Sequence, residues 1–94
     1  AERKAKMLEL ADAVIALPGG FGTFDELFDA YCLYKLGCHR KPCGLLNVAG
    51  YYDGLLQFIS HGVGEGLISR RDRDRLLAAE QPEELLQQLE AAAV

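Results

Sequence analysis

Three glycines and a proline separate an apolar run from an acidic segment, in the stretch Leu17-Pro-Gly-Gly-Phe-Gly-Thr23. Glycines have no side chain, so the backbone N–H groups around them can face an open space. A helix expected to begin near Thr23 would add its unpaired N–H groups and the positive end of its dipole. These features favour a cradle for a phosphate group, formed by Gly19, Gly20, Gly22 and Thr23. A plain glycine turn remains the alternative, because the spacing matches neither a P-loop nor the dinucleotide-binding fingerprint.

Glu26 lies about one helical turn beyond this loop. It follows Thr23 with the spacing of a capping box, in which Thr23 is the N-cap and the Glu26 carboxylate binds the Thr23 N–H. In the functional alternative the carboxylate faces the loop, and the helix dipole helps to keep it ionised. A carboxylate beside a sugar phosphate can stabilise an oxocarbenium-like centre or activate water, as in glycoside hydrolysis. The residues alone leave both alternatives open.

Other reactive residue types have simpler explanations. By themselves, Arg3 and Lys4 are typical of a solvated helix face. The alternating charges of residues 70–75 are typical of a solvated turn. No metal is expected, because the spacing of the remaining candidate ligands is unlike that of a zinc site. These candidates are Cys32, Cys38, His39 and Cys43.

Strands and helices are expected to alternate along the chain. Short continuous apolar runs predict strands buried on both faces, and apolar residues at helical spacing predict helices. The expected strands are residues 13–17, 43–48 and 75–79, and the expected helices are residues 2–10, 24–36, 51–61 and 82–92. Tyr51 and Tyr52 are expected to pack where the third of these helices begins, with contact to a substrate as the alternative.

This alternation predicts an α/β fold, a Rossmann-like three-layer α/β/α arrangement with a parallel sheet, in which residues 1–94 form one domain segment. Parallel sheets of this type bind ligands outside the carboxyl ends of their strands. The glycine-rich loop directly follows the carboxyl end of the first expected strand. The fold and the loop therefore predict a ligand site at the same place.

The composition narrows the classes of partner. The chain has 94 residues, of which 50% are hydrophobic and 26% charged, as in a soluble globular domain. The net charge of −4 argues against a nucleic-acid partner. No apolar run approaches the roughly 18 residues that span a bilayer, so no membrane partner is expected. The three cysteines have no recognised pairing, which favours a reducing, cytoplasmic location.

Two motifs carry a resemblance to a known family. Pro18-Gly-Gly-Phe-Gly-Thr-Phe-Asp-Glu26 resembles the PGGxGTxxE motif of the LOG family, the cytokinin riboside 5′-monophosphate phosphoribohydrolases. Glu2-Arg3-Lys4 resembles the Arg-Lys motif that precedes it in that family, and residues 36–56 are also similar. Some members carry the label lysine decarboxylase. A pyridoxal enzyme needs a Schiff-base lysine and a larger cofactor domain, so no cofactor is expected.

The resemblance implies hydrolysis of the N-glycosidic bond of N6-modified adenosine 5′-monophosphates to the free base and ribose 5-phosphate. It implies that the loop residues named above bind the phosphate, with Lys4 beside them, and that Arg3 and Glu26 are the catalytic pair. It also implies a homodimer or a higher homo-oligomer with the site close to the subunit interface. The alternative is a non-catalytic nucleotide-binding or structural domain, in which Glu26 only closes the capping box.

The sequence departs from the family in two respects. The family's chains are longer, so the resemblance covers only their C-terminal half. The other half carries the first strands, a further glycine-rich loop and part of the nucleotide pocket. In addition, members often have a histidine two residues before the motif arginine, and here Ala1 stands at that position. The preferred N6 substituent, and whether unmodified AMP is a substrate, do not follow from the residues.

Overall fold

The computed structural model describes residues 7–9 and 12–93, which form four strands and their connecting helices. The strands are β1 (Met7–Glu9), β2 (Val14–Ala16), β3 (Cys43–Leu46) and β4 (Leu77–Ala79). The helices are α1 (Phe21–Lys35), the 3-10 turn η2 (Val48–Gly50), α2 (Asp53–Gly64), α3 (Arg70–Arg75) and α4 (Pro82–Ala93). The strands predicted from apolar runs are confirmed, each within a few residues of its expected bounds.

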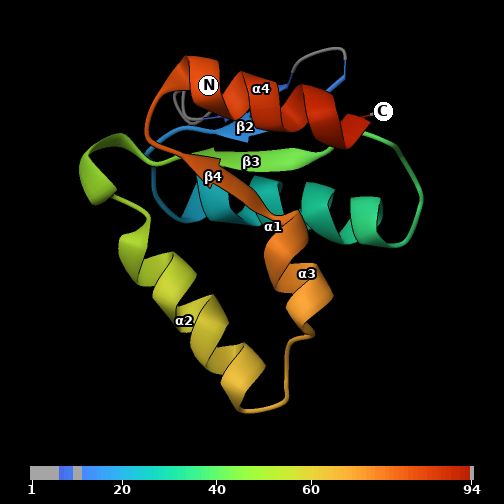
Figure 1. Cartoon of the computed structure of the whole chain (residues 1–94), viewed down its shortest axis with the longest axis vertical. Helices are drawn as coiled ribbons and strands as arrows, with labels where there is room; N and C mark the ends of the chain where they lie inside the picture. Colours follow the sequence, from blue (N-terminus) through green and yellow to red (C-terminus); the bar gives the residue numbers. More distant parts are fainter. Residues whose placement is uncertain (1–6, 10–11, 94) are drawn as a thin grey trace.

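The strands form one sheet in the order β1-β2-β3-β4. β2, β3 and β4 are parallel, with Ile15 opposite Gly44 and Leu45 opposite Ala78, whereas β1 runs antiparallel to β2. Helix α4 covers one face of this sheet and α1 covers the other (Figure 1). The predicted three-layer α/β arrangement is therefore confirmed.

Alternate residues of the strands belong to two separate apolar clusters, one on each face of the sheet. Val14 and Ala16 pack with Leu27 and Tyr31 of α1, while Ile15 packs on the opposite side. The cluster beneath α4 contains Ala13, Ile15, Ala79, Leu85 and Leu89. Burial on both faces explains why these strands appear in the sequence as continuous apolar runs.

The helix predicted for residues 2–10 is wrong where the structure describes it, because Met7–Glu9 forms β1 and pairs with β2. The outer edge of β2 presents unpaired backbone N–H and C=O groups, and β1 satisfies them. Pairing with such an edge can outweigh the helical spacing of the apolar residues in a short segment. Residues 1–6 and 10–11 lie outside the described residues.

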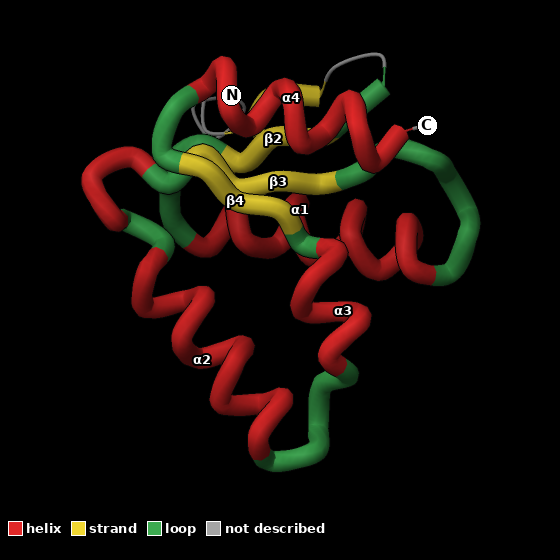
Figure 2. The backbone as a smooth tube through the Cα atoms, viewed as in Figure 1, coloured by secondary structure: helices red, strands yellow, loops and turns green. Residues whose placement is uncertain are grey.

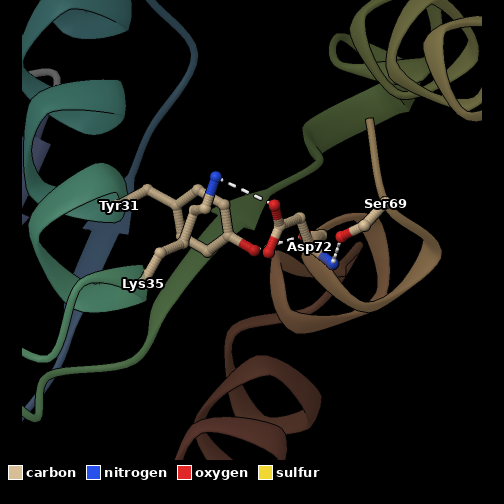
Figure 3. Close-up of polar contacts among 4 residues, drawn as sticks. All are labelled: Tyr31, Lys35, Ser69 and Asp72. Atoms are coloured by element: carbon tan, nitrogen blue, oxygen red, sulfur yellow. Dashed lines mark hydrogen bonds and ion pairs between the residues drawn. The ribbon is translucent and has the colours of Figure 1, made fainter. Parts of the chain in front are cut away.

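The charged turn predicted for residues 70–74 is also wrong, because these residues belong to helix α3. The Ser69 hydroxyl caps this helix by accepting the Asp72 N–H at 3.0 Å. The Asp72 carboxylate pairs with Lys35 of α1 at 2.8 Å, and the Tyr31 hydroxyl donates to the Asp72 carbonyl (Figure 3). The charges therefore attach α3 to α1 and are not simply solvated.

Helices α2 and α3 extend away from the sheet on the side of α1 (Figure 2). None of the residues of α2 is fully buried. Phe58 on α2 is 70% exposed, and Leu67 in the connection to α3 is 85% exposed. This arm therefore presents an apolar surface to its surroundings.

Among the residues that the structure describes, no helix is long and apolar enough to cross a membrane.

Candidate functional site at the carboxyl ends of the strands

The glycine-rich loop lies at the edge of the sheet where the three parallel strands end. It comprises residues 17–20, which leave the carboxyl end of β2 and lead directly into α1. Asn47 follows β3 and Glu80 follows β4 at the same edge. The predicted location of the loop is confirmed, and this is the edge at which parallel α/β sheets bind ligands.

Neither a positive φ nor contact with the described residues explains the glycine at position 20. None of Gly19, Gly20 and Gly22 is among the glycines with positive φ. Gly20 has φ −113° and ψ −150°, and a β-carbon added there would meet no heavy atom within 4 Å. Neither strain nor packing within the described chain therefore requires a glycine at position 20. Glycine is favoured at the start of a helix, and close approach by a bound group is a second physical reason for it.

The start of α1 has the properties of an anion site. Gly20 is the N-cap, no side chain in the described part of the chain caps the helix, and the first turn contains no acidic residue. The first intrahelical bond runs from the Phe24 N–H to the Gly20 carbonyl at 3.1 Å. The N–H groups before Phe24 have no acceptor within the helix, and they lie at the positive end of its dipole. A phosphate could accept hydrogen bonds from them.

Thr23 supplies a second, independent sign of a polar ligand. Its side chain is 1% exposed, and its hydroxyl has no hydrogen-bond partner among the described residues. A buried hydroxyl without a partner costs about 1–3 kcal/mol, so such groups are uncommon unless a ligand or water satisfies them. Thr23 is the third residue of α1, so it belongs to the same helical turn as these N–H groups.

The capping box predicted for Thr23 and Glu26 is wrong, because it requires Thr23 as the N-cap and the N-cap is Gly20. The glycines let the chain turn into the helix earlier, so that Thr23 becomes the third residue of α1. Glu26 is partly buried and lies on the same face of α1 as Thr23, three residues further on. Its catalytic role stays a prediction. Arg3 and Lys4 lie outside the described residues, so the pairing of Arg3 with Glu26 also stays a prediction.

Two tyrosines bind the loop, which the sequence analysis did not foresee. The Tyr52 hydroxyl donates to the Leu17 carbonyl at 2.6 Å, and the Tyr51 hydroxyl donates to the Gly19 carbonyl. Tyr52 is 1% exposed, and burial, with a smaller effect of the neighbouring Tyr51, raises the pKa of Tyr52 to about 12. Its hydroxyl is therefore a protonated donor at neutral pH. A sequence signal existed, since both aromatic hydroxyls follow the end of the strand beside the loop.

Asn47 connects this edge of the sheet to the start of α2. Its side-chain oxygen accepts the Tyr52 N–H at 2.6 Å, and its amide nitrogen donates to the Asp53 carboxylate at 2.8 Å. Its backbone N–H donates to the Ala79 carbonyl at the end of β4, at 2.8 Å. Ala49 and Gly50, with φ of 50° and 74°, make the turn that leads from Asn47 to the tyrosines.

The described residues contain no group of three or more His, Cys, Asp or Glu side chains that could hold a metal ion. Cys32, Cys38 and Cys43 are free thiols, and burial raises the pKa of Cys43 to about 11.

Comparisons with known proteins agree on one family. Residues 1–89 match a family described as "Possible lysine decarboxylase". The chain is 53% identical over 89 residues to the cytokinin riboside 5′-monophosphate phosphoribohydrolase LOG7 of Arabidopsis thaliana, covering 95% of this chain and 41% of that protein. It is 51% identical over 90 residues to the probable cytokinin riboside 5′-monophosphate phosphoribohydrolase LOGL6 of Oryza sativa subsp. japonica, covering 96% and 36%. The chain thus spans about two fifths of the length of the curated relatives it matches.

Proposed function

The chain belongs to the family described as possible lysine decarboxylases, and we propose that the full-length protein is a phosphoribohydrolase. Its substrates are N6-modified adenosine 5′-monophosphates, such as cytokinin riboside monophosphates. Hydrolysis of their N-glycosidic bond releases the free base and ribose 5-phosphate. The names of the relatives support this proposal, since those proteins are called cytokinin riboside 5′-monophosphate phosphoribohydrolases.

The anion site at the start of α1 is the observation that carries the proposal. Three features coincide in this segment: an open space beside Gly20, helix N–H groups with no acceptor within the helix, and a buried Thr23 hydroxyl that has no partner among the described residues. These are the groups that a phosphate monoester needs, because they offer several donors and a positive dipole end. Gly19 and Gly22 leave the backbone on either side of Gly20 open to the same phosphate.

The proposed reaction uses Glu26, which lies about one helical turn beyond Thr23 in α1. Cleavage of an N-glycosidic bond develops positive charge on the ribose ring. With the 5′-phosphate at the loop, the Glu26 carboxylate stabilises that charge more strongly in the transition state than in the ground state. Arg3 is the second catalytic residue and Lys4 adds positive charge beside the phosphate, as the family motif implies.

We further propose that the protein is a homodimer or a larger homo-oligomer in the cytoplasm. The exposed apolar side chains of Phe58 and Leu67 on α2 and the connection to α3 support association, since a second subunit would cover them. The free cysteines support a reducing compartment. Light scattering coupled to gel filtration tests the assembly, and a monomer at micromolar concentration would contradict it.

The function is tested by incubating the full-length protein with isopentenyladenosine 5′-monophosphate, with AMP and with the riboside that lacks the phosphate. Chromatography then measures release of the free base. We expect rapid release from a monophosphate and far slower release from the riboside. Equal turnover of riboside and monophosphate would contradict a role for the phosphate site.

The alternative of a non-catalytic domain has lost its structural argument. It required Glu26 to close a capping box on Thr23, and Thr23 is not the N-cap of α1. No other feature of the described residues favours it over the hydrolase.

A further inference from the structure

We propose that Tyr51 and Tyr52 are positioning residues for the phosphate-binding loop, and that Asn47 holds Tyr52 in place for this task. The inference rests on the proposed phosphate site, but it concerns residues outside the glycine motif. The two hydroxyl contacts join the tyrosines to loop residues 32 and 35 positions earlier in the chain.

Tyr52 fixes the beginning of the loop. Its hydroxyl donates to the Leu17 carbonyl at 2.6 Å, directly after β2. The ring is fully buried and also lies edge-on to Phe24 in the first turn of α1, with 6.3 Å between the ring centroids. One rigid side chain therefore contacts both the start of the loop and the start of the helix. The separation between them sets the width of the anion site.

Tyr51 fixes the direction of the N–H group at the centre of the loop. Its hydroxyl donates to the Gly19 carbonyl, and no cis peptide bond occurs in the described chain. In a trans peptide the carbonyl and the following N–H point in opposite directions. By holding the Gly19 carbonyl, Tyr51 turns the Gly20 N–H away from itself. A glycine peptide has little other restraint against rotating, so this bond decides whether the N–H can donate to a phosphate.

Asn47 connects the segment that contains the two tyrosines to the edge of the sheet. It accepts the Tyr52 N–H at 2.6 Å, donates to Asp53 at 2.8 Å and binds the Ala79 carbonyl through its backbone at 2.8 Å. Asn47 is 7% exposed, so these bonds are shielded from water. The ends of β2, β3 and β4 are thereby joined through Tyr52 and Asn47.

The decisive experiment compares Tyr52→Phe with Tyr31→Phe in the full-length protein. Tyr31 is a matched control, because it too is buried, donates its hydroxyl to a backbone carbonyl and has a pKa raised to about 12, mainly by burial. Its partner is Asp72 of α3 and not the loop. We expect Tyr52→Phe to raise KM for the monophosphate and Kd for ribose 5-phosphate about three- to tenfold, the effect of one neutral hydrogen bond. For the riboside without phosphate, kcat/KM should stay unchanged, and Tyr31→Phe should change none of these values.

A second variant covers the case in which Tyr52→Phe loses its fold. Tyr51 is 52% exposed, so Tyr51→Phe should keep the melting temperature while raising the same KM and Kd. The chemical shift of the Gly20 amide, measured by NMR without ligand, should move in Tyr51→Phe and stay in Tyr31→Phe.

The outcomes separate the two proposals. If the wild type hydrolyses no nucleotide but the Gly20 amide shift still moves in Tyr51→Phe, the proposed function fails and the positioning role stands. If both loop variants bind ribose 5-phosphate like the wild type, or if Tyr31→Phe weakens binding equally, the positioning role is overturned.

Discussion

Replacing Gly20 by alanine should separate the stability of the fold from the binding of phosphate. The φ of −113° is accessible to alanine, and the added β-carbon meets no heavy atom within 4 Å. Substituting alanine for glycine at a compatible position stabilises a protein by about 0.4–1 kcal/mol, because the unfolded chain loses conformational freedom. The methyl group would nevertheless occupy the open space beside the helix N–H groups. Alanine is a poorer N-cap than glycine, and this cost offsets the gain. We therefore expect a melting temperature close to that of the wild type together with at least about tenfold weaker binding of ribose 5-phosphate, which corresponds to about 1.4 kcal/mol.

Gly44→Ala is the matched control for this prediction. Gly44 lies in β3 under α4, and a β-carbon there would lie 2.8 Å from Cδ1 of Leu85, which is 1% exposed. Overpacking of this kind costs about 1–3 kcal/mol, so the melting temperature should fall while the affinity of the folded protein for ribose 5-phosphate stays the same. Thermal unfolding and isothermal titration calorimetry measure both quantities. Wild-type affinity in Gly20→Ala would refute the argument that a ligand explains the glycine.

Three further perturbations test neighbouring parts of the argument. Glu26→Gln should lower kcat at least about 10²-fold with little change in KM, as expected for loss of one electrostatic or general-base group. A kcat near that of the wild type would remove Glu26 from the mechanism. Thr23→Val removes a buried hydroxyl that has no partner among the described residues, so urea unfolding should show the unliganded protein stabilised by about 1 kcal/mol. The same change should weaken phosphate binding. A loss of stability would show that the hydroxyl has an internal role. The hydrogen bond from Lys35 lowers the pKa of Asp72 in the folded protein. The pair therefore stabilises the fold at pH values above the ordinary aspartate pKa of about 3.9. This contribution disappears as the pH falls through the lowered pKa of the folded protein. Asp72→Asn should thus cost less than about 1 kcal/mol at pH 7, since the pair is partly exposed, and progressively less as the pH falls below the ordinary aspartate pKa. A cost independent of pH would contradict the ion pair.

The elements that sequence reasoning predicted correctly are those whose signals are local. Residues 13–17 and 43–48 are continuous apolar runs, and the structure places β2 and β3 within them. The errors arose where contacts with other elements decide. Met7–Glu9 is a strand that pairs with the edge of β2, and residues 70–75 form a helix whose Asp72 is bound by Lys35 and Tyr31 of α1. Tyr31 and Asp72 are 41 residues apart, so no local window contains both. β1 and β2 are neighbours in the chain, but the apolar spacing of the first segment does not reveal their pairing.

The same distinction applies to the site. The loop could be predicted because glycines, strand end and helix start are adjacent in the chain. Thr23 was assigned to the wrong helix position, since the glycines allow α1 to begin at Phe21. The tyrosine contacts could not be predicted, because each hydroxyl meets a carbonyl more than thirty residues earlier, at separations of 32 and 35.

The glycine loop and the three side chains that hold it, those of Asn47, Tyr51 and Tyr52, depend on different properties of their residues. A glycine motif leaves the backbone accessible, but the freedom that makes it accessible also leaves its N–H groups without a fixed direction. Binding then carries the entropic cost of ordering the loop, which a preformed site avoids. Two phenol groups and one amide, all attached to the neighbouring strand end, supply that order from outside the motif. A chain that kept every glycine of the loop but lost these three side chains should therefore retain the motif and bind phosphate weakly.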